Sequence, residues 1–211
     1  MSRFPRRPTN FRLSGRWSEP PVFSSNYTRF FAVCPLLMLG CRTYDATEIR
    51  GALAGAASAL EAGDGIRLFP YIDERARFAL GSTVKSRIDA RALIEADYPV
   101  AERTAAVAAL GDAAQVATPD ELFARRCTPE CMRTLAGQVG APVSQSVEGD
   151  EVRVTTSRGT TLHMFAGHDG RYGIVWNTAD CMAERAQASR DFRQIQENAT
   201  IYRKRRALGA K

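Results

Sequence analysis

The sequence is poor in the residues that most often carry enzyme chemistry. It has only two histidines, His163 and His168. It contains no Gly-x-Ser-x-Gly nucleophile motif, no Walker-type phosphate loop and no dinucleotide-binding glycine fingerprint. A metal site built on the cysteines would need a fourth ligand, and their spacing fits no standard zinc pattern. The sequence therefore predicts no catalytic residue, no metal ligand and no cofactor, and it favours a protein that is not an enzyme.

An excess of basic charge is also lacking once the first 41 residues are set aside. The whole chain has 29 basic and 23 acidic side chains, but residues 1–41 hold six of the arginines and one acidic residue, Glu19. The remainder is close to neutral, apart from a basic run at Arg203–Arg206. A nucleic-acid-binding domain normally presents a strong positive footprint. We therefore expect no nucleic-acid partner.

The apolar segment before Cys41 is too short to cross a bilayer. Eleven uncharged residues lie between Arg29 and Cys41, and polar residues follow at once. A spanning helix needs about 20 apolar residues, whereas the apolar core of a secretory signal needs about 7–15 after a positive charge. The pattern predicts an export signal. The alternative is an ordinary buried helix or strand, although Pro35 in its middle disfavours a helix.

The last four residues of this segment, Met38-Leu39-Gly40-Cys41, resemble the lipobox of bacterial lipoproteins. The resemblance implies that Cys41 becomes the lipidated first residue, carrying diacylglycerol and a further acyl chain such as palmitate. It also implies a membrane partner through that anchor. Because Arg42 is not the aspartate associated with inner-membrane retention, the resemblance implies an outer-membrane lipoprotein of the cell envelope that faces the periplasm.

The expected organisation follows from this signal. Residues 1–21 are rich in arginine, proline and serine, so they form either a disordered extension or an artefact of a translation start placed too early, with the true start near Val22. Residues 22–40 are the expected signal peptide and 41–46 the lipidated tether. Residues 47–211 are expected to form a single α+β domain.

Helical periodicity dominates the first part of this domain. Apolar spacing predicts helices over 47–62, from Asp64 to Gly81, from Ser82 or Thr83 to Tyr98, and over 99–110. Threonine followed by proline predicts two further helix starts, at Pro119 and Pro129, with Glu121 completing a capping box. A long final helix is expected from Asn177 or Thr178 to about Leu208.

The period changes to two between these helices. Short runs at 143–147, 151–156, 160–165 and 171–176 alternate apolar with polar residues and are separated by turn sequences. They predict a four-stranded antiparallel β-meander with one face toward a core and the other toward solvent. The expected fold class is therefore α+β, with a helical first half, the meander and a long C-terminal helix.

Three cysteines lie in the body of the chain, Cys127, Cys131 and Cys181. Because three is an odd number, at most one intramolecular disulfide forms among them. A bridge from Cys181 to either of the other two would hold the last helix against the helical region. The alternative is three buried small apolar side chains.

The first helix, the segment Asp73–Phe78 and the run Gly170–Ile174 resemble exported proteins of the nuclear-transport-factor-type superfamily. That resemblance implies a cone-shaped α+β fold with a curved sheet around a pocket. His163, Tyr172 and Trp176 are then the candidate pocket residues.

Two functions remain open from the sequence. One is a non-enzymatic interaction or accessory module with an envelope protein as partner. The alternative is a small-ligand carrier or enzyme of the cone-fold type. A solid core in which Leu162, Met164 and Ile174 interlock with Trp176 would favour the first, and an apolar pocket with convergent polar groups would favour the second.

Overall fold

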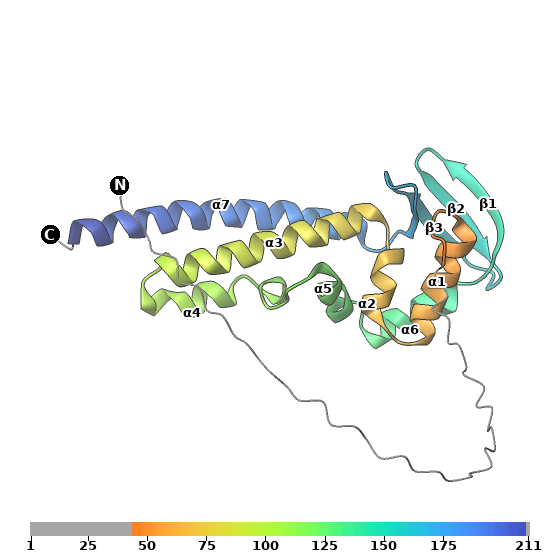
Figure 1. Ribbon diagram of the computed structural model, residues 1–211, viewed down its shortest axis with the longest axis horizontal. Helices are drawn as coiled ribbons and strands as arrows, with labels where there is room; N and C mark the ends of the chain where they lie inside the picture. Colours follow the sequence, from red (N-terminus) through yellow and green to blue (C-terminus); the bar gives the residue numbers. More distant parts are fainter. Residues whose placement is uncertain (1–43, 210–211) are drawn as a thin grey trace, which may run out of the picture. The chain divides into compact units, whose positions relative to one another are not determined.

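The computed structural model describes residues 44–209, and the fold of this part is α+β. Figure 1 shows helices at both ends of the described chain and a sheet between them in sequence. The export segment and Cys41 lie outside the described residues. The described helices are α1 (Ile49–Glu61), α2 (Gly65–Leu68), α3 (Glu74–Asp97), α4 (Val100–Ala108), α5 (Pro119–Arg126), α6 (Pro129–Gln138) and α7 (Thr178–Gly209), with 3-10 turns η1 (Phe69–Tyr71) and η2 (Asp112–Ala114).

The first helix, α1, confirms the predicted apolar stripe. Its buried side chains are small or aliphatic, among them Ala52, Leu53, Ala56 and Leu60. They belong to the larger of two hydrophobic cores, which also includes the inner face of the sheet. Ala46, the last residue of the expected tether, is buried as well, so the folded part begins at least one residue before the expected start of the domain at Thr47.

The third helix differs from the prediction. The sequence suggested a break at Gly81, but α3 runs without interruption from Glu74 to Asp97. Asp73 starts it by accepting the backbone N–H groups of Arg75 and Ala76. Buried residues continue on both sides of Gly81, so tertiary packing outweighs the cost of about 1 kcal/mol for a glycine inside a helix. The helix expected from Asp64 to Gly81 is instead divided into α2, the 3-10 turn η1, which contains Pro70, and the start of α3.

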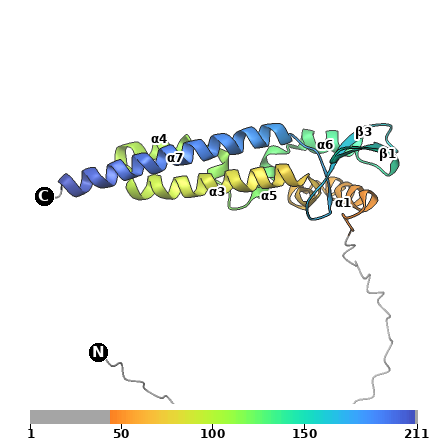
Figure 2. The ribbon, with the colours of Figure 1, turned by 90° about the horizontal axis from the view of Figure 1, so that it is seen from above.

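The long C-terminal helix is confirmed, and α7 lies beside α3 in both Figure 1 and Figure 2. A second, smaller core joins them, in which the rings of Tyr98 and Tyr202 meet edge to face with centroids 4.9 Å apart. An ion pair of 2.7 Å links Arg87 to Asp191. Asp97 at the end of α3 binds Arg203 and Arg206, which accounts for half of the basic run.

The predicted meander is confirmed as a four-stranded antiparallel sheet in the order β1-β2-β3-β4. The strands are β1 (Pro142–Glu148), β2 (Glu151–Thr156), β3 (Thr161–Ala166) and β4 (Tyr172–Ile174). In β2 and β3 the expected alternation holds, because one side chain in two is buried over most of their length. In β1 it does not hold, since every residue after Pro142 is exposed.

Candidate interaction surface at the edge of the sheet

The two edges of the sheet differ in whether other described segments cover them. The outer edge of β4 is covered, because the N–H of Tyr172 donates to the carbonyl of Ala46 at 2.8 Å and the N–H of Asp73 donates to the carbonyl of Ile174 at 3.0 Å. Figure 1 shows β1 as the outermost strand at the opposite edge. Within residues 44–209 no strand pairs with that outer edge.

The hydrogen-bonding direction of β2 follows from the bonds at its two ends. The N–H of Thr156 donates to the carbonyl of Thr160, and the N–H of Ala166 donates to the carbonyl of Asp150. In antiparallel pairs the backbone groups of successive residues alternate between the two neighbouring strands. The even-numbered residues of β2 therefore face β3, and the odd-numbered residues face β1.

The same alternation fixes the direction of β1. The odd-numbered residues of β2 are opposite Ser144, Ser146 and Glu148, so these three direct their N–H and C=O groups toward β2. Gly149, with φ of 62°, forms the first residue of the tight turn between Glu148 and Glu151 and holds this register. Gln145 and Val147 consequently direct their backbone N–H and C=O groups outward, where a further strand can pair.

The side chains of β1 leave this edge accessible. Val143 and Val147 are each 69% exposed, and the strand contains no lysine or arginine. Its single charge, Glu148, is at the far end and pairs with Arg153 at 2.9 Å. Natural edge strands are usually protected by charges, prolines or bulges. Here the bulge between Pro142 and Ser144 disturbs only one end of the strand.

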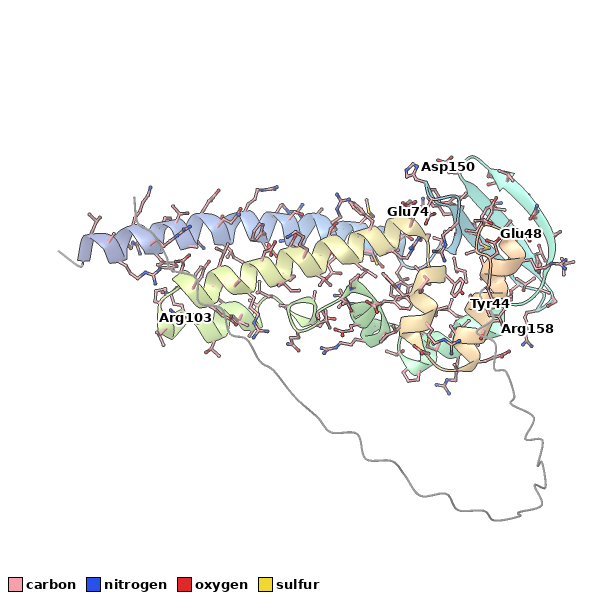
Figure 3. The ribbon with its side chains drawn as sticks, viewed as in Figure 1. Tyr44, Glu48, Glu74, Arg103, Asp150 and Arg158 are labelled. Carbon is pink, nitrogen blue, oxygen red and sulfur yellow. A yellow bond between two sulfur atoms is a disulfide. The ribbon has the colours of Figure 1, made fainter. Side chains whose placement is uncertain are left out.

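A groove of about 450 Å³ lies beside the first half of β1. The start of α1 forms one wall, with Glu48 and Arg50, and Tyr172 contributes a ring. The start of β1, from Pro142 to Gln145, forms the other wall. In Figure 3, Glu48 marks the start of α1 beside the sheet and Asp150 marks the turn of the β1–β2 hairpin. The groove and the outward backbone groups together form a surface suited to an extended peptide strand.

The three candidate pocket residues are not brought together. Tyr172 lines the groove, whereas His163 is on the opposite face of the sheet, opposite Arg153, with its Nδ1 atom 3.8 Å from Glu151. Trp176 packs edge to face on Phe123 with ring centroids 4.8 Å apart. Tyr172 and Trp176 both pack against the larger core, but of the three residues the groove is lined only by Tyr172, so they do not form one binding site.

The cysteines pair locally. Cys127 is bonded to Cys131 across the junction of α5 and α6, with Cα atoms 5.2 Å apart. The bridge therefore links two neighbouring helices and does not hold α7, as a bond to Cys181 would have done. Thr128 begins α6 as predicted, since its hydroxyl accepts the N–H of Cys131. The predicted capping box at Glu121 does not form, because the Thr118 side chain makes no cap bond and the Glu121 carboxylate accepts the N–H of Ala117, one residue before the cap.

Cys181 is buried in the first turn of α7 and bonds to no other described cysteine. Burial raises the pKa of its thiol to about 11. Arg126 lies nearby and joins two carboxylates, Asp112 at 2.9 Å and Glu184 at 2.8 Å. This pairing connects η2, α5 and α7, so the surroundings of Cys181 are explained by packing and ion pairing.

The remaining site predictions concern the membrane and metals. In the part of the chain that the structure describes, no helix has the length and apolarity to cross a bilayer. Residues 44–209 also contain no cluster of three or more histidine, cysteine, aspartate or glutamate side chains that could hold a metal ion. Lipidation of Cys41 falls outside the described residues and stays a prediction.

The accessible edge of β1 was not identified from the sequence. The alternation of Val143, Gln145 and Val147 with serines predicted a strand there, and that prediction is confirmed. The only sequence feature that suggested exposure of both faces of this strand was the placement of serines between its valines, which are themselves exposed in the structure.

Comparison of this chain with protein-family models, with curated proteins and with solved structures finds no match. The function is therefore argued from the surface itself.

Proposed function

We propose that this chain is a lipid-anchored protein of the bacterial cell envelope whose folded domain is a non-enzymatic interaction module. In this proposal Cys41 carries the anchor, in an outer membrane facing the periplasm, and the outer edge of β1 binds an extended segment of a protein partner. The observation that carries the proposal is the pair of outward-facing residues, Gln145 and Val147, on a strand with no described partner. Main-chain hydrogen bonds to such an edge provide affinity, and the adjacent groove provides specificity.

The interior of the domain supports an interaction module over a ligand carrier. Leu162, Met164 and Ile174 are buried in one core, and Trp176 packs against it. This is the interlocked arrangement expected if the inner face of the sheet is filled by side chains. The groove at β1 is open at an edge of the sheet. An extended chain can enter such a groove, whereas a small molecule is normally bound in an enclosed pocket.

The position of the surface also fits an anchor at Cys41. Ala46 is fixed to β4 by its hydrogen bond from Tyr172, and only four residues separate it from Cys41. The five residue-to-residue steps between them span at most about 18 Å when fully extended. A lipid on Cys41 would therefore hold the start of α1, and with it the groove, close to the membrane surface.

The anchor is tested by the intact mass of the protein from the membrane fraction of a diderm bacterial host. We expect a product that begins at Cys41 and is heavier by a diacylglycerol and one further acyl chain. The Cys41→Ala variant should carry no lipid. A soluble product that retains residues before Cys41 in both forms would overturn the anchoring proposal.

The surface is tested by a photoreactive amino acid placed at Ser144 in cells that express the full chain. We expect a crosslinked protein product from this position and none from Thr200, an equally exposed position on α7. Gln145→Pro should abolish the product, because it removes an outward N–H without removing a bond to β2. Gln145→Ala is the control and should retain it. Crosslinking that is unaffected by Gln145→Pro would contradict the role of the edge.

A further inference from the structure

The accessible strand β1 reads the same in both directions around its central residue. Residues 143–147 are Val-Ser-Gln-Ser-Val. In an antiparallel pair of two copies centred on Gln145, each residue faces its own kind: Val143 is opposite Val147, Ser144 is opposite Ser146, and Gln145 is opposite Gln145. Such a pairing is isologous, as a two-fold symmetric dimer requires.

The backbone geometry agrees with this register. Hydrogen-bonded pairs in an antiparallel ladder are formed by residues whose N–H and C=O groups face each other. The register centred on Gln145 places Gln145, whose backbone groups face outward, opposite Gln145 of the other copy. It places the outward-facing Val147 opposite Val143, which lies at the bulge between Pro142 and Ser144, so the ladder is regular at its centre and ends at the bulge. A register shifted by one residue would place an outward-facing residue opposite one that faces β2, so the ladder would not form.

Charge favours the same orientation. The single charged residue of β1 is Glu148, and in the antiparallel register it is opposite Pro142 of the other copy. The two Glu148 side chains are then at opposite ends of the ladder. In a parallel pairing they would be adjacent, and like charges directly opposite each other are destabilising.

We propose that the partner of the β1 edge is a second copy of this chain, paired antiparallel about Gln145 so that two four-stranded sheets form one continuous sheet of eight strands. This inference rests on the proposed use of the edge for interaction and identifies the partner. Pairing of five residues alone buries less than the roughly 1,200 Å² of a stable complex. The dimer is therefore weak in dilute solution and favoured where membrane anchors concentrate the chains.

The test is crosslinking in intact cells by the full chain with the photoreactive residue at Ser144. Cells co-express two copies with different tags, and the measured product contains both tags at twice the chain's mass. Three double variants share this background: V143E/V147E, V143K/V147K and V143K/V147E. Residues 143 and 147 of one copy are roughly 13 Å apart along a strand, so in none of the three double variants do the two new side chains contact each other within one chain.

We expect the dimer product to fall at least tenfold in V143E/V147E and V143K/V147K, because like charges then face each other across the pair. V143K/V147E places lysine opposite glutamate in the proposed register and should keep the product within about twofold of the parental chain. Equal thermal unfolding of the three purified variants shows that a loss is not caused by misfolding.

Three results would overturn the proposal. They are equal dimer yield in all variants, loss of the dimer in V143K/V147E as well, and a Ser144 crosslink only to a different protein. In the last case the edge would still serve an interaction module, so the proposed function would stand. If the chain carries no lipid but the variants show the expected dependence on charge, the anchoring proposal fails and the pairing proposal stands.

Discussion

The hydroxyl of Thr178, the first residue of α7, donates a hydrogen bond of 2.5 Å to the Oδ2 atom of Asp73, which immediately precedes α3. Asp73 is fully buried, and its Oδ1 atom accepts the N–H groups that begin α3. The Asp73 N–H also holds β4. The carboxylate of Asp73 thus joins the starts of the two long helices, and its backbone N–H ties them to the edge of the sheet.

Replacing this carboxylate should be costly. We expect Asp73→Ala to lower the free energy of unfolding by about 3 kcal/mol, since it removes a helix cap and leaves buried donors without an acceptor. Asp64→Ala is the matched control, because Asp64 caps α2 through one exposed hydrogen bond and should cost about 1 kcal/mol. Chemical denaturation measures both. Equal losses in the two variants would show that Asp73 acts only as a local cap.

Two glycines should respond to alanine in opposite directions. A Cβ atom on Gly173 would lie 2.5 Å from Cα of Asp73 and 2.6 Å from its nitrogen, and neither backbone atom can move freely. A Cβ atom on Gly137, within α6, meets nothing within 4 Å. We expect Gly173→Ala to destabilise the domain by more than about 2 kcal/mol. Gly137→Ala should stabilise it by up to about 1 kcal/mol. Thermal melts of both variants decide this, and a Gly173→Ala protein as stable as the parent would contradict the close approach of β4 to Asp73.

The thiol of Cys181 should be unreactive in the folded protein. Its pKa is raised to about 11 by burial, against 9.0 for an ordinary thiol, so its thiolate fraction at pH 8 is roughly 100-fold lower. We expect iodoacetamide to modify Cys181 only after denaturation, or as the pH approaches 11. Peptide mass spectrometry without reducing agent follows this cysteine separately from Cys127 and Cys131, which should resist alkylation until they are reduced. Rapid labelling of Cys181 at pH 8 in the native protein would contradict its burial.

The stability contributed by Asp112 should disappear in acid. The hydrogen bonds from Arg126, aided by its charge, hold the pKa of Asp112 below its usual value of 3.8. A lowered folded-state pKa means that the carboxylate stabilises the fold above about pH 4 and loses this effect as the pH falls through its folded-state pKa. We expect Asp112→Asn to reduce stability at pH 7, and the difference from the parent should shrink between pH 4 and pH 2. A difference that is constant over this range would show that the interaction with Arg126 does not depend on charge.

Local chemistry was sufficient for much of the secondary structure. The two Thr-Pro pairs placed the starts of α5 and α6, and period-two alternation placed the four strands within one or two residues at most ends. The meander order also followed, because short turns between neighbouring strands leave antiparallel pairing as the direct arrangement. Where local signals conflicted with packing, the prediction was wrong: Gly81 appeared to end a helix, yet the buried residues around it continue α3 through it.

The sequence by itself determined the fold class, the order of the elements and the palindrome at residues 143–147. Only the tertiary structure decided that the palindrome lies on an accessible edge, that Cys127 bonds to Cys131, and that His163, Tyr172 and Trp176 do not line one binding site. The physical reason is that alternation specifies which residues share a face of a strand, while exposure depends on what covers that face. The covering of β4 by Ala46 and Asp73, and the absence of any such cover on β1 among residues 44–209, arise from segments distant in sequence.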